Sequence, residues 1–245
     1  MNVTKIEWTD WTLNPVVGCN NGCPYCYAQK QAKRQKQRCG MCYDFEPHPH
    51  LERLNQLTPK QKPRKIFIDS MWDWNGEGVK EEWLQKIIEK MKECSQHTFQ
   101  ILSKRPKGYG RFEFPSNVWL GTSIATSEDC HRVHTLANLK NSNIKFVSIE
   151  PIHKHINFWF SKEIIDWIII GAETGNRKGK IKPEGEWITA IVENARAEEI
   201  PLFLKGNLLW PETIQEYPGT TKRYLKNTGS PNDSCGYEFQ NDTQQ

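Results

Sequence analysis

The run "DWIIIGAE", residues 166–173, decides the fold class of this chain. Its apolar residues, Trp167 through Ile170, stand side by side and do not alternate with polar ones. A strand with one face in water would alternate, so this run predicts a strand covered on both faces, as in a parallel sheet. Similar runs occur at 65–70, 98–104, 117–123, 144–150 and 200–206, and "LNPVVGC" around residue 16 predicts a first strand.

Helical patterns separate several of these strands. In residues 80–94 apolar side chains recur every three or four positions along one face, and 128–141 and 185–199 repeat that spacing. Strands that alternate with helices indicate βαβ units, which build parallel sheets. About six or seven such units fit the chain, so we predict an α/β fold, an incomplete (β/α)6–7 TIM-like barrel with parallel strands. A doubly wound open sheet is the alternative.

The barrel is expected to span residues 1–210, and residues 211–245 to form a C-terminal extension or tail. Within the barrel we expect a cysteine-bearing loop at 18–28, followed by a basic, cysteine-rich insertion at 29–64. The chain has no apolar run long enough to cross a membrane, and its N-terminus lacks the pattern of a signal peptide. We therefore expect a cytoplasmic protein with no membrane partner.

Cysteine content and charge point toward particular chemistries. The chain has eight cysteines, and their close spacing in a cytosolic protein of this length favours metal or redox chemistry over a disulfide scaffold. Residues 1–65 carry a net charge of +6, whereas the remainder carries −2. The basic segment "QKQAKRQKQR", residues 29–38, is expected to be helical. It could follow a phosphate backbone, or it could be only a solvated face.

Polar residues follow the predicted strands at their carboxyl ends. In parallel α/β folds this edge holds the active site, because the loops after the strands converge there. One mouth would then collect three thiols, several carboxylates and hydroxyls, and two lysines. The strand-end residues are Cys19, Cys23, Cys26, Asp69, Ser70, Asp73, Ser103, Lys104, Arg105, Thr122, Ser123, Ser148, Glu150, Glu173, Thr174 and Lys205.

The segment "GCNNGCPYCYA", residues 18–28, carries Cys19, Cys23 and Cys26 as C-x3-C-x2-C. Three thiols are one ligand short of a closed zinc or iron–sulfur site. A zinc knuckle in which Cys39 and Cys42 supply further ligands is one alternative. The C-x3-C-x2-C spacing, with an aromatic residue directly before the last cysteine, is a more specific pattern than such a knuckle.

This spacing resembles the cysteine motif of the radical S-adenosylmethionine (radical SAM) superfamily. The segments "TKIEWTDWTLNPVVGC", "GCPYCYA", "SKRP", "WLGTS", "SIEP" and "GAETG" together resemble an uncharacterised phage-associated branch of that superfamily. "SKRP" and "IEP" are also similar to spore photoproduct lyase-like proteins. The resemblance covers roughly residues 4–207, and it implies a 4Fe–4S cluster on Cys19, Cys23 and Cys26 whose fourth iron is open to S-adenosylmethionine.

The resemblance implies an enzyme. In the superfamily an external one-electron reductant feeds the cluster, which cleaves the cofactor to a 5′-deoxyadenosyl radical that takes hydrogen from the substrate. Residues 69–73, "DSMWD", stand where the family has a Gly-Gly-Glu-type segment that binds the cofactor amine. Because the segment departs from that pattern, Ser70 and Asp73 are the favoured amine ligands.

The other cofactor contacts also follow from the resemblance, position by position. Tyr25 would lie against the adenine, Lys104 would pair with the cofactor carboxylate, and Ser123 would contact the ribose. A polar contact to ribose or substrate is implied at Glu150, and close approach of the backbone to the adenine at Gly171 and Ala172.

A second metal is a separate expectation. Cys39 and Cys42 precede His48 and His50, and the four could bind a zinc ion or an additional iron–sulfur cluster, or the cysteines could be free thiols in a loop. Cys94 and Cys130 are expected to be buried on helices. The candidate substrate contacts are Trp72, Trp74, Arg105, Glu173 and Lys205.

Two functions remain as hypotheses at this point. The favoured one is a radical SAM enzyme that modifies a nucleotide or nucleic-acid substrate, which the basic N-terminal third and the lyase-like motifs favour. The alternative is a non-enzymatic zinc-binding nucleic-acid module that uses the five cysteines from Cys19 to Cys42 with nearby histidines. A zinc module leaves the polar residues at the strand ends unexplained.

Overall fold

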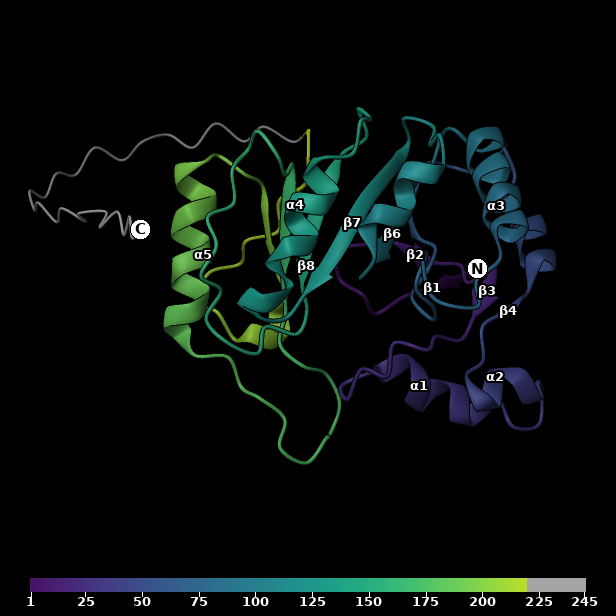
Figure 1. The fold of residues 1–245 in the computed structure, drawn as a ribbon, viewed down its shortest axis with the longest axis horizontal. Helices are drawn as coiled ribbons and strands as arrows, with labels where there is room; N and C mark the ends of the chain where they lie inside the picture. The colour runs from purple at the N-terminus through teal and green to yellow at the C-terminus, as the bar shows by residue number, and fades with distance from the viewer. Residues whose placement is uncertain (220–245) are drawn as a thin grey trace, which may run out of the picture.

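The computed structural model describes residues 1–219. Cys235 and residues 220–245 of the expected C-terminal extension lie outside the described residues. Among the described helices, none combines the length and the apolar character that a membrane crossing requires. One large curled sheet dominates the fold, with helices along its outer side and a cysteine-bearing segment at one end (Figure 1).

Eight strands within residues 1–219 form this sheet, in the order β1-β2-β5-β6-β7-β8-β9-β10. β1 (Asn2–Val3) is antiparallel to β2, and every neighbouring pair from β2 to β10 is parallel. The parallel strands are β2 (Trp11–Thr12), β5 (Lys65–Phe67), β6 (Thr98–Ser103), β7 (Val118–Ile124), β8 (Lys145–Ile149), β9 (Trp167–Ile170) and β10 (Leu202–Leu204).

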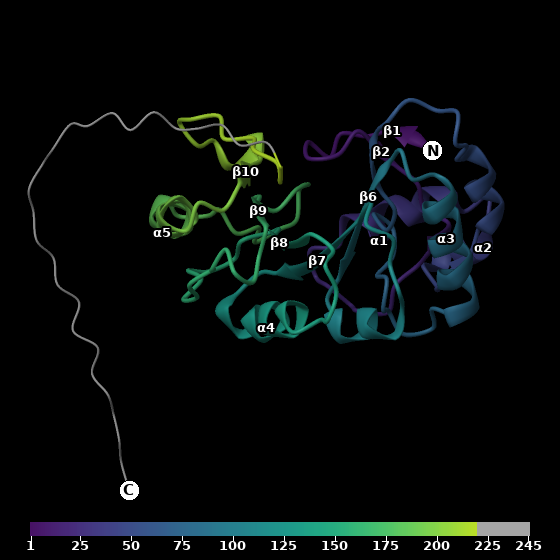
Figure 2. The same cartoon turned by 90° about the horizontal axis from the view of Figure 1, so that it is seen from above.

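The strand order decides between the two predicted architectures. The strands follow sequence order across the sheet, whereas a doubly wound sheet reverses its direction part of the way along. The sheet curls into an open arc with β1 and β10 at its two ends (Figure 2). The prediction of an incomplete, TIM-like barrel of parallel strands is therefore confirmed.

The predicted first strand is wrong as a member of this sheet. Residues 16 and 17 form β3 (Val16–Val17), which pairs antiparallel with β4 (His48–Pro49) in a separate ribbon. The first parallel strand is β2, and the Leu13 amide extends its pairing by donating to the Phe67 carbonyl at 3.1 Å. Pro15 has no backbone N–H, so the chain cannot continue this ladder and leaves the sheet.

Three helices cover the outer side of the arc (Figure 2): α3 (Glu81–Glu93), α4 (His131–Ala137) and α5 (Gly185–Ala197). All three lie in segments with a predicted helical pattern. The beginning of the segment at 128–141 is the 3-10 helix η4 (Ser127–Cys130). Between β6 and β7 the chain forms only the 3-10 helix η3 (Pro106–Arg111), whose proline and two glycines disfavour an α-helix.

β9 is apolar on both faces because two different cores lie against it. Ile168 and Ile170 of β9 belong to the large core between the sheet and the helices. Trp167 and Ile169 of the same strand belong to a second cluster, inside the curl, with Trp8 and other aromatic residues. Burial of each such side chain stabilises the fold by about 1.5–3 kcal/mol, which explains why "WIII" does not alternate.

The cysteine-bearing segment lies at the carboxyl ends of the strands, on the side to which the β7 arrow points (Figure 1). It comprises α1 (Tyr27–Ala32), the 3-10 helix η1 (Lys33–Gln35), α2 (Gly40–Asp44), β4 and the 3-10 helix η2 (Leu51–Gln56). The basic segment 29–38 is thus helical as far as Gln35. Burial in this segment is sparse: Ala28, Ala32 and Phe45 form a small cluster.

The N-terminal segment lies across the opening between the two ends of the sheet. The Gly206 amide donates to the Glu7 carboxylate at 2.9 Å, and Trp8 is buried inside the curl. After β10 come η5 (Gly206–Leu208) and a return segment, in which Ile214 accepts a hydrogen bond from the Leu204 amide at 2.8 Å. These contacts cover the edge of β10 and leave the cavity open at the carboxyl ends of the strands.

Candidate active site

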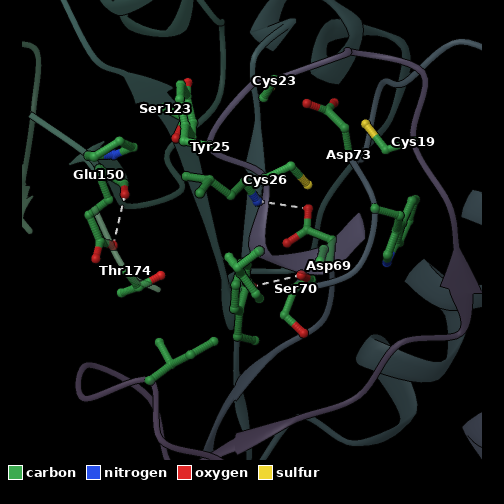
Figure 3. Close-up of a pocket in the computed structure, with 18 of the residues that line it drawn as sticks. Cys19, Cys23, Tyr25, Cys26, Asp69, Ser70, Asp73, Ser123, Glu150 and Thr174 are labelled. Carbon is green, nitrogen blue, oxygen red and sulfur yellow. Dashed lines mark hydrogen bonds between the residues drawn. The ribbon is translucent and has the colours of Figure 1, made fainter. Parts of the chain in front are cut away.

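A cavity of about 530 Å³ lies where the strand ends meet the cysteine loop (Figure 3). Its size is in the range of small-molecule sites in proteins. The N-terminal segment from Val3 to Trp8 forms part of its wall. The predicted site residues that line it are Cys19, Cys23, Tyr25, Cys26, Ser70, Trp72, Asp73, Lys104, Ser123, Glu150, Ala172, Glu173 and Lys205.

The three cysteines are presented by a loop that both sheets hold in place. The Gly18 amide donates to Met71 O at 3.0 Å, and the Cys19 amide donates to Phe45 O at 3.1 Å. Cys26 begins α1, and its sulfur accepts a hydrogen bond from the Gln29 amide at 3.4 Å. All three cysteines are partly exposed, and all three line the cavity.

Burial acts on two of these thiols. It raises the pKa of Cys19 to about 11, and the nearby Asp73 carboxylate adds to the effect. Burial also raises the pKa of Cys23, although the Lys104 ammonium opposes this shift. In the metal-free protein these groups are therefore neutral thiols at neutral pH, and a bound metal would have to displace their protons.

Asp73 organises the loops around the cysteines. One carboxylate oxygen accepts hydrogen bonds from the Ser103 hydroxyl at 2.6 Å and the Asn75 amide at 3.1 Å. The other accepts from the Asn21 side chain at 3.0 Å and the Lys104 amide at 2.9 Å. A carboxylate has about four acceptor positions, so the chain itself occupies all those of Asp73. Asp73 therefore joins the cysteine loop to the ends of β5 and β6.

Asp69 presents the opposite situation. Its Oδ2 accepts a hydrogen bond from the Leu102 amide at 2.9 Å, but its Oδ1 is buried without a partner. Burial raises the pKa of this carboxyl well above its ordinary value. A buried acceptor without a donor is a costly arrangement, and a cation or hydrogen-bond donor that reached it would relieve it. Sequence reasoning preferred Ser70 and Asp73 here and overlooked Asp69, although Asp69 directly follows the apolar run of β5.

Glu150 is held on the far side of the cavity from Asp73 (Figure 3). Lys205 pairs with Glu150 Oε1 at 2.7 Å, while the Trp8 indole and the Ser148 hydroxyl each donate to Oε2 at 3.0 Å. Gly171 leaves the room for this pair, since a Cβ on it would lie 2.6 Å from Glu150 Oε1. Gly171 itself is not among the residues that line the cavity.

The remaining predicted contacts are distributed around the cavity wall. The ammonium of Lys104 lies 5.7 Å from the ring centre of Tyr25, which stands edge-on to the His153 ring at 4.9 Å. The Asn207 side chain holds the backbone of Ala172: it accepts a hydrogen bond from Ala172 N at 3.1 Å and donates one to Ala172 O at 2.8 Å. The Ser70 hydroxyl is paired with the side chain of Asn14.

Two predicted substrate contacts do not line the cavity. Trp74 is fully buried and packs against Trp72 with ring centres 5.4 Å apart, so it is a core residue. Arg105 is exposed and directs its carbonyl to the Asn75 side chain. Both lie beyond the last paired residue of a strand, where the direction of a side chain depends on the loop and not on the alternation of the strand.

One predicted substrate contact, Glu173, has partners that the sequence reasoning did not foresee. Glu173 forms a two-pronged pair with Arg177, each bond 2.7 Å long, and also lies 3.4 Å from His153. The Arg177 guanidinium lowers the pKa of Glu173. A spacing of four residues, as between Glu173 and Arg177, brings two side chains together on a helix. This segment shows no helical pattern, so the sequence did not indicate the ion pair.

The structure gathers the four residues of the predicted second metal site. Cys39, Cys42, His48 and His50 each offer a ligand atom, and these atoms lie within 4.8 Å of one another. The group does not include Cys19, Cys23 or Cys26. The two sets of cysteines are thus separate, and a single zinc module built from all five cysteines has no support in the described residues. Cys94 and Cys130 are buried, as predicted.

A search of curated proteins finds no match. A solved structure similar to this chain is a spore photoproduct lyase double mutant with bound AdoMet and a dinucleoside spore photoproduct, at 10% sequence identity and a TM-score of 0.49. The alignment covers 81% of this chain and 64% of that one, and at this similarity it does not bear on activity. The phage association stays a prediction, because neither match concerns it.

A family model covers nearly the whole chain. It matches residues 3–231, and its description is "Protein of unknown function (DUF5131)". The match includes the cysteine loop, the Cys/His group and the strands from β2 to β10. This chain therefore belongs to the DUF5131 family.

Proposed function

We propose that this chain is a radical SAM enzyme in which Cys19, Cys23 and Cys26 hold a 4Fe–4S cluster. One observation carries the proposal: three cysteines with C-x3-C-x2-C spacing line the same cavity as the polar ends of the parallel strands. Thiolates are the usual ligands of such clusters, and three of them leave one iron open. When bound, the cluster supplies the electron that cleaves S-adenosylmethionine.

The donor set fits the cofactor as well as the cluster. S-adenosylmethionine carries an ammonium and a carboxylate on the same carbon. Asp69 Oδ1 is a buried acceptor without a partner, and both Asp69 and the partly exposed Lys104 line the cavity. We therefore assign the cofactor amine to Asp69, in place of Asp73, and the cofactor carboxylate to Lys104.

The other residues of the wall position these groups. Asp73 fixes Asn21 of the cysteine loop and the backbone of Lys104 through one carboxylate oxygen, so that the cluster loop and the cofactor-binding lysine cannot shift independently. Tyr25 and the clamped peptide of Ala172 offer surfaces for an adenine ring, and Ser123 offers a hydroxyl for the ribose. Glu150 and Lys205 form an ion pair, so this part of the wall is polar but carries no net charge.

For the substrate we propose a nucleotide or nucleic acid. Lys30, Lys33, Arg34, Lys36 and Arg38 are all exposed on or directly after α1, the helix that starts at the cysteine loop. Such a row beside an open cavity would attract a phosphate backbone. Binding should then weaken steeply with salt, and exchange of Lys30 and Arg34 for alanine should reduce the salt slope while leaving the cofactor site intact.

The enzyme proposal is tested by anaerobic reconstitution of the full chain with iron and sulfide, followed by reduction with dithionite in the presence of S-adenosylmethionine. We expect a 4Fe–4S spectrum and release of 5′-deoxyadenosine. Cys23→Ala should abolish both, whereas Cys94→Ala, which changes a buried cysteine away from the cavity, should retain both. A fully loaded cluster that never cleaves the cofactor would overturn the proposal.

A further inference from the structure

We propose that Cys39, Cys42, His48 and His50 bind one structural zinc ion, which anchors the segment that supports the cysteine loop. This site is separate from the proposed 4Fe–4S site and does not depend on it. Its four ligand atoms come from two short pieces of chain: the start of α2, which carries both cysteines, and the region of β4, which carries both histidines.

The distances match a tetrahedral site. Zinc binds sulfur at about 2.3 Å and nitrogen at about 2.0–2.1 Å, so a sulfur and a nitrogen on one tetrahedral ion lie about 3.5 Å apart. His48 Nε2 lies 3.5 Å from Cys39 Sγ and 3.3 Å from Cys42 Sγ, and His50 Nε2 lies 3.3 Å from Cys42 Sγ. The two Nε2 atoms are 3.0 Å apart, close to the value of about 3.3 Å for two nitrogens on one ion.

The protonation of the two histidines also calls for a cation. His48 Nδ1 lies 2.6 Å from the Glu46 carbonyl, which can only accept, so this nitrogen carries the proton. His50 Nδ1 lies 3.1 Å from the Glu52 carboxylate and carries its proton for the same reason. In the neutral imidazole form, which is the form that binds a metal, both Nε2 atoms then present lone pairs to each other. A carbonyl and a carboxylate behind the ring are the usual outer partners of metal-bound histidines.

A single ion fits this group better than an iron–sulfur cluster does. All four ligand atoms lie within 4.8 Å of one another, whereas a cluster distributes its ligands over several irons and separates them. Two thiolates and two imidazoles in a tetrahedron are a typical zinc ligand set. His48 and Cys42 are buried while Cys39 and His50 are partly exposed, so the site is closed by protein and still accessible to an incoming ion.

The two short helices around the site have little apolar core of their own. α1 and α2 have six and five residues, lengths at which a helix is not stable without outside contacts. Their buried apolar cluster consists of two alanines and one phenylalanine. Small units with so little core commonly depend on a metal or a disulfide. A zinc ion would supply that support here.

The position of the site explains what the ion would stabilise. Val17 pairs with His48 across the β3–β4 ribbon, and two residues further along, the Cys19 amide donates to Phe45 O. Phe45 stands between the ligands Cys42 and His48. The carbonyl that holds the first cysteine of the loop therefore lies on the stretch of backbone between these two ligands. We assign the four ligands a positioning role and no catalytic one.

The test is metal analysis of the full chain, purified both aerobically and anaerobically. We expect one zinc per chain under both conditions. Cys42→Ser and His48→Ala should lose the zinc, whereas Cys94→Ser and Cys130→Ser, which change buried cysteines outside the group, should keep it. Cys23→Ala should lose iron and keep zinc, which separates this proposal from the radical SAM proposal.

Two further measurements cover the case in which a ligand variant does not fold. Glu52→Gln leaves all four ligands in place but weakens the acceptor behind His50, and it should lower the zinc affinity roughly 10- to 100-fold in a competition with a chelator. Cobalt substituted into the wild-type chain should give the strong visible absorption of a tetrahedral site with thiolate ligands. Zinc-free wild-type protein, zinc that survives in Cys42→Ser, or iron in place of zinc at this group would overturn the proposal.

Discussion

Replacement of Gly18 by alanine would put a Cβ where the backbone just before β4 already lies. Gly18 has φ of +101°, and a Cβ on it would stand 2.1 Å from Glu46 O, 2.2 Å from Glu46 C and 2.6 Å from Pro47 N. All three are backbone atoms, which cannot rotate out of the way as a side chain can, so the segment before β4 would have to move away by about 1 Å. That movement separates β3 from β4 and breaks the support of Cys19.

The expected loss of stability has two parts. A positive φ at a residue with a side chain costs about 1–3 kcal/mol, and overpacking against backbone costs about 1–3 kcal/mol more. We therefore expect Gly18→Ala to lower the free energy of unfolding by about 4 kcal/mol. For a chain of this size that loss lowers Tm by roughly 8–16 °C.

Gly22 provides a matched control in the same loop. It also has a positive φ, +63°, but a Cβ on it would meet nothing within 4 Å. Gly22→Ala should therefore cost only about 1 kcal/mol, partly offset by the reduced entropy of the unfolded chain. Thermal and urea unfolding of the full-length variants, followed by circular dichroism, measure the difference. Equal Tm shifts in the two variants would refute the argument. The loss of stability would then come from the positive φ that both positions share, and not from the contact of the new Cβ with residue 46.

Three other predictions concern the cavity and the core. Asp69→Asn should weaken cofactor binding. Burial raises the pKa of the Asp69 carboxyl in the folded protein, so wild type loses stability as the pH rises from the unfolded-state pKa through the folded-state pKa. The asparagine does not titrate, so the Tm of the variant should rise relative to that of wild type over this pH range. A Tm difference that stays constant with pH contradicts this. Lys205→Met leaves Glu150 without its cation and should cost about 2–3 kcal/mol in urea unfolding, with much of the loss recovered in the double variant that also carries Glu150→Gln. Ile169→Ala empties a fully buried position and should cost about 2–5 kcal/mol, and a loss below about 1 kcal/mol would show that the interior cluster rearranges freely.

The parallel strands could be predicted because their signal is in the residues themselves. A strand such as β9 must be apolar on both faces to contact both the helix-side core and the interior cluster, and that requirement produces a continuous apolar run. β2 could not be found in this way. It consists of Trp11 and Thr12 alone, and its membership in the sheet depends on pairing with β5, more than fifty residues later.

The site was predictable in its composition and less so in its roles. Residues at strand ends converge in any such sheet, and a C-x2-C pair followed by two histidines is recognisable as a ligand set. The difference between Asp69 and Asp73 could not be read from the sequence. It depends on which donors reach each carboxylate, and the donors to Asp73 come from residues 21, 75, 103 and 104, which three separate loops bring together.

The contact between Glu7 and Gly206 also bears on the order in which parts of the structure can form while the chain is being synthesised. These residues are 199 positions apart, and Trp8 and Glu150 are 142 apart, so the wall that residues 3–8 contribute cannot be fixed until the last strand has been made. Contacts this distant in sequence form late in folding. The residues of the cysteine loop and of the Cys/His group are near the N-terminus and are synthesised long before that. A growing chain would therefore hold its thiols open to incoming metal throughout most of its synthesis, and the closing of the barrel would come afterwards.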